Sequence, residues 1–379
     1  MNISILGGDT SKFGELWHIS PRDLVRTVVS EALMEADLKA DKIEAIYVGN
    51  MLSGILGSQE HLGAFFAEEL NIQVPAVKVE GACASGGLAV HLAVLAISSG
   101  MYENVLVLGV EKMTDHPPEE VAKALMGAGS ESERTAGATF PALYAMMARA
   151  HMEKYGTTEE ELAAVAVKNH FHASLNSRAQ FPFSVSLAQV MESSCVASPL
   201  KLLDCSPISD GAAALILSGR KNKTQKIRLS ASTMATDTLG LTERADLTVV
   251  KSAITAVNKA YRMVGISAKD IDVAEVHDCF TIAEIIAMED LGFFEKGKAG
   301  KAIVNGQTTL GKGKLVVNPS GGLKACGHPV GATGVKQVVE IYHQLKGNCD
   351  SRQVKNAKLG LTHNVGGSGA TAVIHILQK

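Results

Sequence analysis

The chain has 379 residues, of which 46% are hydrophobic and 20% charged, so it is long enough to bury a large core and has the composition of a globular enzyme. A net charge of −3 without a long run of Lys or Arg argues against a nucleic-acid partner. No apolar run approaches the roughly 18 residues of a membrane span, and no secretion signal is recognisable. We therefore expect a cytoplasmic protein without membrane partners.

Cysteine usage agrees with a reducing compartment. The six cysteines are scattered and form no CxxC pair, so neither a disulfide framework nor a zinc ribbon is indicated. They are Cys83, Cys195, Cys205, Cys279, Cys326 and Cys349. Reduced thiols are the expectation.

Short β-branched runs alternate with helical patterns along the chain. The first set of strand-like runs is ISIL (3–6), EAIYVG (44–49), AVKVE (76–80) and NVLVLGV (104–110), with the helical LAVHLAVLAISSG at 88–100. A second set follows at 226–233, 272–278, 314–320, 357–364 and 371–377. This alternation predicts a layered α/β fold.

The two sets also resemble each other. The helix-to-strand pattern at 22–48 aligns with 245–276, and SGGL occurs after a strand both at 85–88 and at 320–323. We infer an internal duplication. The predicted N-terminal half is 1–114 plus 205–219, and the predicted C-terminal half is 226–379. Residues 115–204 have another character and are predicted to form an inserted loop or lid, and KNKTQK (221–226) is a polar linker.

Cys83 lies between a predicted strand and a helical pattern, in GACASGG (81–87). The unpaired N–H groups at a helix N-terminus favour an anion, and a thiol there is expected to be more acidic than usual. The glycines at 81, 86 and 87 are expected to allow a tight turn and the close approach of a ligand. This stretch alone leaves two interpretations open, a nucleophile or a small core residue.

Three stretches of the second half combine His, Asn or Cys with glycine. They are EVHDCF (275–280), LKACGHPVGATG (323–334) and THNVGGSGA (362–370). Each follows or ends a predicted strand, and a duplicated α/β fold brings such loops together at one crevice. We expect them to meet Cys83 there.

With GACASGG, HDCF, GHPVGATG and HNVGGSGA in this order across essentially the whole length, the sequence resembles the thiolase family. HDCF narrows the resemblance to the branch with the sterol-carrier-protein type and the archaeal-type acetoacetyl-CoA thiolases. FGELW, VEKMTD and GATFPALYAMMARAHM are similar to the archaeal type. The resemblance implies two duplicated α/β halves layered α-β-α-β-α, with an inserted loop domain.

The implied activity is that of an acetyl-CoA C-acetyltransferase, which condenses two acetyl-CoA or runs in reverse through an acyl-cysteine. Coenzyme A thioesters are substrates, and no cofactor is implied. The resemblance further implies a homodimer or homotetramer. For the archaeal type it implies an OB-fold, zinc-ribbon protein and a hydroxymethylglutaryl-CoA synthase as partners.

In this interpretation Cys83 attacks the acyl-CoA carbonyl, and His328 takes the thiol proton and helps to hold an oxyanion. A turn-capping role is the alternative for His328. Common thiolases carry their acid/base cysteine at the position of Asn364, or of His363 one residue off. Neither residue is a thiol, so the acid/base group must come from elsewhere in the chain. The resemblance implies Cys279 as the replacement, and the alternative is a buried apolar cysteine.

The remaining roles concern oxyanions. His277 stands where many thiolases carry Asn and is expected to help to order the enolate oxyanion site. The backbone N–H groups of Cys83 and Gly366 are expected to form a second oxyanion hole, with Asn364 beside it. No role is assigned to Cys326.

Several sequence features remain open. Lys168 and Arg178 suggest contacts with the phosphates of coenzyme A or a solvated helix face, and neither is assigned. His170 and His172 have metal-like spacing, but their flanks are helical and no further ligand is evident, so no metal is expected.

Three alternatives to the leading activity also stay open. They are a thiolase for longer-chain or sterol-type 3-ketoacyl-CoA, a ketoacyl-synthase-like enzyme, and a weakly active CoA-binding subunit of a complex.

Overall fold

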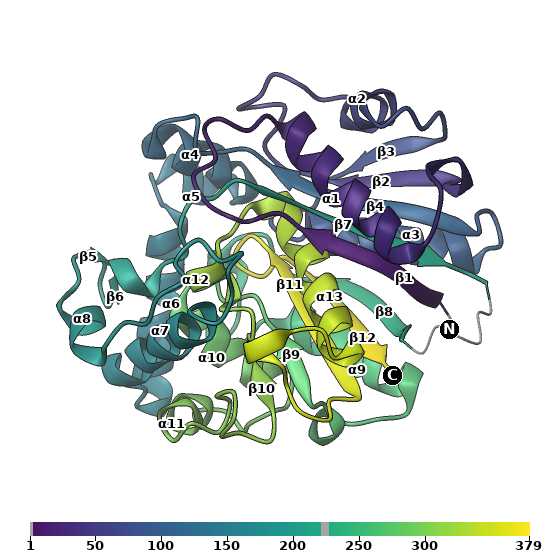
Figure 1. The fold of residues 1–379 in the computed structure, drawn as a ribbon. Helices are drawn as coiled ribbons and strands as arrows, with labels where there is room; N and C mark the ends of the chain where they lie inside the picture. The colour runs from purple at the N-terminus through teal and green to yellow at the C-terminus, as the bar shows by residue number, and fades with distance from the viewer. Residues whose placement is uncertain (1–2, 221–226) are drawn as a thin grey trace.

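The computed structural model describes residues 3–220 and 227–379 (Figure 1). The predicted linker at 221–226 lies outside the described residues. The N-terminal half contains β1 (Ile3–Thr10), α1 (Pro21–Ala36), β2 (Ala45–Gly49), α2 (Leu62–Glu69), β3 (Ala76–Val79), α3 (Ser85–Ser98), β4 (Asn104–Glu111) and β7 (Gly211–Ser218). The C-terminal half contains β8 (Arg228–Thr236), α9 (Lys251–Val264), β9 (Val273–Glu275), α10 (Thr281–Asp290), α11 (Ala299–Val304), β10 (Val316–Val317), α12 (Gly322–Cys326), α13 (Val330–Lys346), β11 (Leu359–Gly366) and β12 (Thr371–Gln378).

The strand order shows the duplication directly. The strands run β3-β2-β4-β7-β1 in the first half and β10-β9-β11-β12-β8 in the second. In each half the first three strands of this order are parallel to one another. The fourth strand pairs antiparallel with both of its neighbours. The halves join at β1 and β8 through only two residue pairs, Ile3 with Leu229 and Ser4 with Arg228. The predicted duplicated α/β fold is confirmed.

The layers follow from which helices are buried on both sides. Helices α3 and α13 lie between the two halves, and their apolar side chains share one core with strands of both. Helix α3 is therefore buried at most positions. Helices α1 and α2 cover the outer face of the first half, and α9 and α10 cover that of the second (Figure 1).

Glycines allow the two central helices to touch. A Cβ on Gly86 would lie 2.7 Å from Gly331 O, and one on Gly334 would lie 2.1 Å from Gly87 N. Such contacts are shorter than side chains allow, so these positions must be glycine. The sequence interpretation gave Gly86 and Gly87 to ligand approach. In the structure Gly86 packs against α13, and Gly87 packs against Asn364 and Val373 of strands β11 and β12.

Between β4 and β7 the chain forms a mostly helical segment that contacts the C-terminal half (Figure 1). Its elements are α4 (Pro118–Leu125), α5 (Glu131–Thr135), α6 (Phe140–Tyr155), α7 (Glu159–Ala173), α8 (Leu187–Glu192), β5 (Cys195–Ala197) and β6 (Leu200–Lys201). We call residues 115–204 the inserted segment, and its exact boundaries stay a prediction.

Helix α7 of the inserted segment is not a solvated face. Lys168 is buried, where its Nζ lies 2.5 Å from Glu284 Oε1 and donates to Val317 O. His170 and His172 are also buried, and each donates from Nδ1 to a main-chain oxygen, of Phe183 and Asn318 respectively. Arg178, beyond this helix, pairs with Asp9. Within residues 3–220 and 227–379, no helix has the length and apolar character to cross a membrane.

Candidate active site

A cavity of about 200 Å³ lies where the loops of both halves meet the inserted segment. Its lining includes all four predicted catalytic side chains, which are Cys83, His277, Cys279 and His328. The rest of the lining is mainly apolar, with contributions from Met113, Leu125, Phe140, Tyr144, Pro207, Ile208, Phe280 and Val330. The structure therefore brings together the three separate sequence stretches that carry these residues.

Cys83 lies in a strained turn between β3 and α3. The preceding Ala82 has φ 53°, in the left-handed region that non-glycine residues rarely adopt. Burial raises the pKa of the Cys83 thiol to about 12, although a hydrogen bond from the backbone of Gly367 opposes this and nearby Glu111 adds to it. The sequence interpretation expected a more acidic thiol at the helix N-terminus, but desolvation outweighs that effect. Cys83 therefore needs a base.

The hydrogen bonds around His328 define its tautomer. Thr333 Oγ1 lies 3.0 Å from Pro329 O and 2.8 Å from His328 Nδ1. A carbonyl oxygen accepts only, so the single hydroxyl hydrogen goes to Pro329 O and Nδ1 must carry the ring proton. Nε2 is then a free acceptor, and it has no partner among the described residues. Burial lowers the pKa of His328 to about 3, which keeps the ring neutral.

Asn364 defines the tautomer of His277 in the opposite sense. The Asn364 amide Nδ2 donates to Cys83 O at 3.0 Å and to His277 Nδ1 at 3.3 Å, and its Oδ1 accepts from Gly87 N. Because Nδ1 of His277 accepts, Nε2 carries the proton. Burial holds the pKa of His277 well below its usual range. Both amide hydrogens of Asn364 are engaged in these two bonds. Its predicted contact with substrate stays a prediction, and the side chain has no free donor for it.

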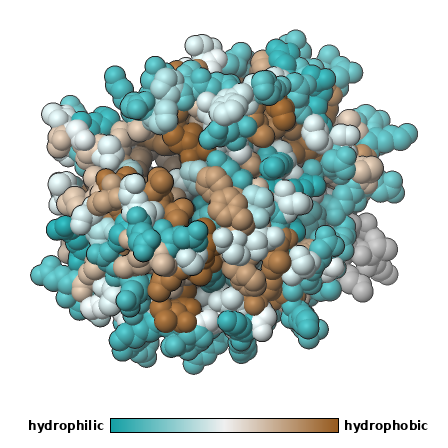
Figure 2. Space-filling view, turned by 60° about the vertical axis from the view of Figure 1, so that its left-hand side comes forward, coloured by the Kyte–Doolittle hydropathy of each residue, from teal (hydrophilic) through white to brown (hydrophobic). Residues whose placement is uncertain are grey.

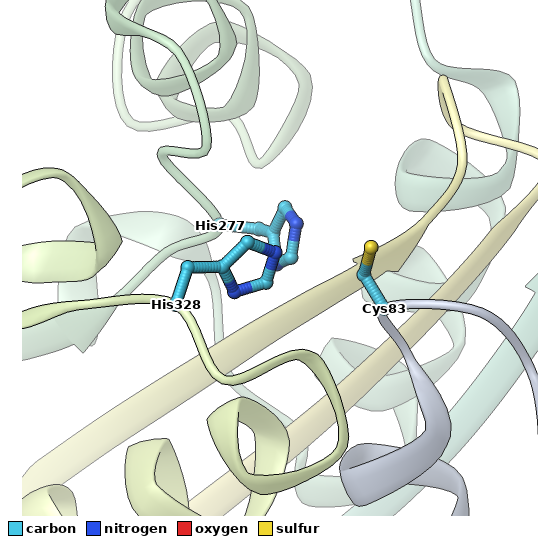
Figure 3. A group of neighbouring side chains, drawn as sticks. All are labelled: Cys83, His277 and His328. Atoms are coloured by element: carbon cyan, nitrogen blue, oxygen red, sulfur yellow. The ribbon is translucent and has the colours of Figure 1, made fainter. Parts of the chain in front are cut away.

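Cys83, His277 and His328 form one group (Figure 3). Sγ of Cys83 and one nitrogen of each imidazole ring lie within 4.8 Å of one another. The two rings are arranged edge to face, with their centroids 5.0 Å apart. Three such atoms could also hold a metal ion. If Nε2 of His277 bound a metal ion, the ring proton would have to move to Nδ1. That N–H would then point at the N–H of Asn364, so two donors would face each other. The group fits proton transfer better than coordination.

Cys279 follows β9 and precedes α10, in the same cavity. Its main-chain oxygen accepts from Ser206 N at 2.9 Å, which ties the loop to the end of the inserted segment. Burial raises the pKa of its thiol, and nearby Cys83 raises it further. Cys279 is therefore a neutral thiol at rest, poised beside the nucleophile.

Both glycines at the end of β11 line a second cavity, and one of them also lines the active-site cavity. Gly367 lines the active-site cavity and donates its backbone hydrogen bond toward Cys83. Gly366 lines the cavity on the other side of residues 80–82, and a Cβ there would lie 2.4 Å from Gly81 O. The predicted role of Gly366 as an oxyanion donor is untested, and Gly367 is the glycine that the structure places at the sulfur.

Sequence reasoning missed two buried carboxylates. Asp278 accepts from Leu323 N, Lys324 N and the Asn169 amide, so it fastens the HDCF loop to the segment that leads to His328. Glu111, at the end of β4, accepts from main-chain N–H groups of Met51, Leu52 and Gly331. Burial raises the pKa of Glu111 to about 7. The sequence signal that could have found them is their position inside two of the motifs, HDCF for Asp278 and VEKMTD for Glu111.

Cys326 stands apart from this chemistry. It is buried, its Sγ accepts from Asn176 Nδ2 at 3.7 Å, and it lines a separate polar cavity of about 320 Å³. Only one residue stands between it and His328 in the chain, yet it does not line the active-site cavity.

A duplicated α/β fold that gathers two thiols and two neutral imidazoles in one cavity defines a cysteine-dependent acyltransferase. The family described as "Thiolase, N-terminal domain" matches residues 3–221, and "Thiolase C-terminal domain-like" matches 233–379. The chain belongs to the thiolase family.

Relatives support this at full length. The chain is 46% identical to an acetyl-CoA acetyltransferase of Methanothermobacter thermautotrophicus over 100% of both chains. It is 47% identical to one of Methanocaldococcus jannaschii, over 99% of this chain and 98% of that protein. Human sterol carrier protein 2 is 34% identical over 93% of this chain and 66% of its own length.

Solved structures share the fold. The chain aligns over its whole length with an Ltp2-ChsH2(DUF35) aldolase, with a TM-score of 0.84, 23% identity and 97% of that chain covered. An acetyl-CoA acetyltransferase from Syntrophomonas wolfei aligns with a TM-score of 0.75, 20% identity and 98% coverage of that chain. At these identities the likeness is one of fold.

Proposed function

We propose that this chain is an acetyl-CoA C-acetyltransferase, which forms acetoacetyl-CoA and coenzyme A from two acetyl-CoA and catalyses the reverse thiolysis. The observation that carries the proposal is the free Nε2 of His328, grouped with Cys83 in a cavity that also contains the second thiol, Cys279. The names of the two full-length archaeal relatives support the choice of substrate.

In the first half-reaction the free Nε2 of His328 accepts the Cys83 proton as the sulfur attacks the acetyl-CoA carbonyl. The tetrahedral oxyanion is stabilised by backbone N–H groups at the turn that holds Cys83. When the intermediate collapses, His328 returns the proton to the departing coenzyme A thiolate. The product is acetyl-Cys83.

In the second half-reaction Cys279 first gives its proton to the free Nε2 of His328, which returns it to Cys83 at the end of the cycle. The Cys279 thiolate then removes a proton from the methyl group of a second acetyl-CoA. The Nε2–H of His277 is the donor available for the enolate oxygen, because Asn364 occupies Nδ1. The enolate carbon attacks acetyl-Cys83, and collapse releases acetoacetyl-CoA and the Cys83 thiolate, which takes back a proton.

The alternatives are less well supported. A decarboxylating ketoacyl synthase needs no deprotonating thiol, yet Cys279 lies in the cavity. Sterol-type relatives are 33–34% identical, below the archaeal acetyltransferases. An inactive CoA-binding subunit would not need the paired tautomers of His277 and His328.

The test compares Cys83→Ala, Cys279→Ala and the control Cys326→Ala, whose thiol lies outside the cavity. With radiolabelled acetyl-CoA, Cys83→Ala is expected to form no acetyl-enzyme. Cys279→Ala is expected to form acetyl-enzyme but no acetoacetyl-CoA, while the control does both. Condensation by Cys279→Ala at the wild-type rate would refute the assignment of the acid/base thiol.

We further propose an assembly of two or four copies in the cytoplasm, with an OB-fold, zinc-ribbon protein and a hydroxymethylglutaryl-CoA synthase as partners. Strand β3 lies at one end of the strand order and exposes Val77, which supports pairing with a second copy. The inserted segment exposes Met146, Val196 and Leu202, and apolar side chains interrupt the hydrophilic surface in Figure 2. A DUF35 protein accompanies the structural neighbour, by its title. Co-purification and light scattering test these assemblies.

A further inference from the structure

Tyr144 is a buried tyrosine of the inserted segment whose hydroxyl reaches the active site. It lies on helix α6, is 3% exposed and lines the cavity. Its hydroxyl donates to Gly367 O at 3.1 Å, and its ring stacks on Phe280 with centroids 4.7 Å apart. Because Phe280 directly follows Cys279, the stacking also holds the Cys279 loop against α6.

The same residue lines the cavity together with Cys279, and its hydroxyl influences the Cys279 thiol. The hydrogen bond from Tyr144 lowers the pKa of the Cys279 thiol, against the larger effect of burial. Burial, followed by nearby Cys279, raises the pKa of Tyr144 well above its usual range, so the phenol stays protonated and remains a donor. The other titratable groups near Cys279 are Asp278, beside it in the chain, and Cys83, Cys205, His277 and His328 in the lining of the cavity.

The one hydroxyl hydrogen therefore has two candidate acceptors, which are Gly367 O, its partner in the structure, and Cys279 Sγ in the same cavity. While Cys279 is a thiol, its S–H can donate to the phenol oxygen, and the phenol hydrogen stays on Gly367 O. Once Cys279 is a thiolate, Sγ becomes the stronger acceptor, since hydrogen bonds to charged groups are about twice as strong as neutral ones. Rotation about a single C–O bond is enough to move the hydrogen.

We propose that Tyr144 is the positioning residue for Cys279, which turns its hydroxyl from Gly367 O to Sγ when the thiolate forms. The proton of the Cys279 thiol first passes to the free Nε2 of His328, and no reactant from outside the site is needed. The α-C–H bond of acetyl-CoA breaks, the proton forms an S–H bond on Cys279, and the C–H electron pair becomes the enolate. The phenol keeps its own proton throughout and returns to Gly367 O. This inference rests on the proposed function, because it assigns Cys279 to the α-proton.

The test is Tyr144→Phe, which removes the hydroxyl and keeps the ring on Phe280. Deuterium incorporation into the methyl group of acetyl-CoA in D₂O reports the Cys279 step, and the rate of acetyl-enzyme formation reports Cys83. We expect deuterium exchange to slow roughly tenfold and its pH profile to move to higher pH. Loss of a hydrogen bond to a charged group lowers the ionisation constant of the Cys279 thiol by about 10–100-fold. The remaining thiolate is more basic, which recovers part of the lost exchange rate. Acetyl-enzyme formation is expected to be unchanged.

The matched control is Tyr261→Phe, which removes a hydroxyl that donates to Leu291 O at 2.9 Å away from the cavity. It is expected to leave both rates unchanged. Equal losses of exchange and acetylation in Tyr144→Phe would overturn the proposal, because they would show that the hydroxyl only holds Gly367 near Cys83. Exchange at the wild-type rate and pH profile would also overturn it.

A second measurement covers poor folding of the variant. In a Cys83→Ala background, the pH dependence of Cys279 alkylation by iodoacetamide is compared between the chain that keeps Tyr144 and the chain that also carries Tyr144→Phe, without any turnover. A midpoint at higher pH in the Tyr144→Phe chain supports the proposal, and an unchanged midpoint refutes it. Failure of the proposed function is separate, because wild type would then form no acetyl-enzyme or Cys279→Ala would still exchange.

Discussion

Replacing Asn364 with Asp tests whether the tautomer of His277 is set by its neighbour. The change keeps the size of the side chain and the acceptor for Gly87 N at 3.0 Å. It removes both donated hydrogens, to Cys83 O at 3.0 Å and to His277 Nδ1 at 3.3 Å, and places a carboxylate oxygen against two acceptors. His277 is then expected to move its proton to Nδ1 and donate it to the new carboxylate, which leaves Nε2 as an acceptor facing the enolate.

The expected loss follows from one missing oxyanion donor. Such a donor contributes about 3–4 kcal/mol, or about 10²–10³ in rate. Acetoacetyl-CoA thiolysis, followed by loss of the substrate's enolate absorbance, is expected to fall by this factor in Asn364→Asp. The control is Gln337→Glu, the same amide-to-acid change at a buried residue that donates to His363 O and does not line the cavity. A folded Asn364→Asp enzyme within about threefold of wild type would refute the reasoning, with threefold being under about 1 kcal/mol.

Three further predictions concern neighbouring groups and pH. Thr333→Val removes the acceptor for His328 Nδ1 and is expected to slow acetyl-enzyme formation about tenfold or more, whereas Thr333→Ser keeps the hydroxyl and the rate; equal rates in both would contradict the tautomer assignment. Glu111→Gln places an amide NH₂ against N–H donors that occupy both carboxylate oxygens, so the free energy of unfolding in urea is expected to fall by about 2–4 kcal/mol, and an unchanged midpoint would contradict this. Burial lowers the pKa values of His172, His328, His363 and His375 to about 3. Because these folded-state values lie below the unfolded value near 6.5, their stabilisation is complete above that pH and is lost as pH falls toward 3, by up to about 1.4 kcal/mol per pH unit for each histidine. Urea midpoints at pH 7 and pH 5 check this, and a higher midpoint at pH 5 would refute it.

The Cys83 loop shows where local patterns mislead. Its position before a helix correctly indicated the turn, but the expected acidity of the thiol depends on solvent exposure, which only packing determines. The same holds for Gly86 and Gly87, whose lack of a side chain makes room for α13 and for strands β11 and β12, all in the other half of the chain. Lys168 likewise reads as a surface residue until its partner Glu284 is placed beside it.

The sequence by itself determined the α/β class and the duplication, because periodicity and the repeated SGGL are local properties of the chain. The four side chains of the cavity were predicted from the resemblance that its motifs bear to thiolases. Only the tertiary structure decided which ring nitrogen of His277 and His328 carries a proton, since that depends on Asn364 and Thr333 and on burial. It also placed Tyr144 of the inserted segment, to which the sequence assigned no chemistry, in the cavity that Cys279 lines. Protonation and hydrogen bonding are set by neighbours in space, and those neighbours exist only once the halves have packed together.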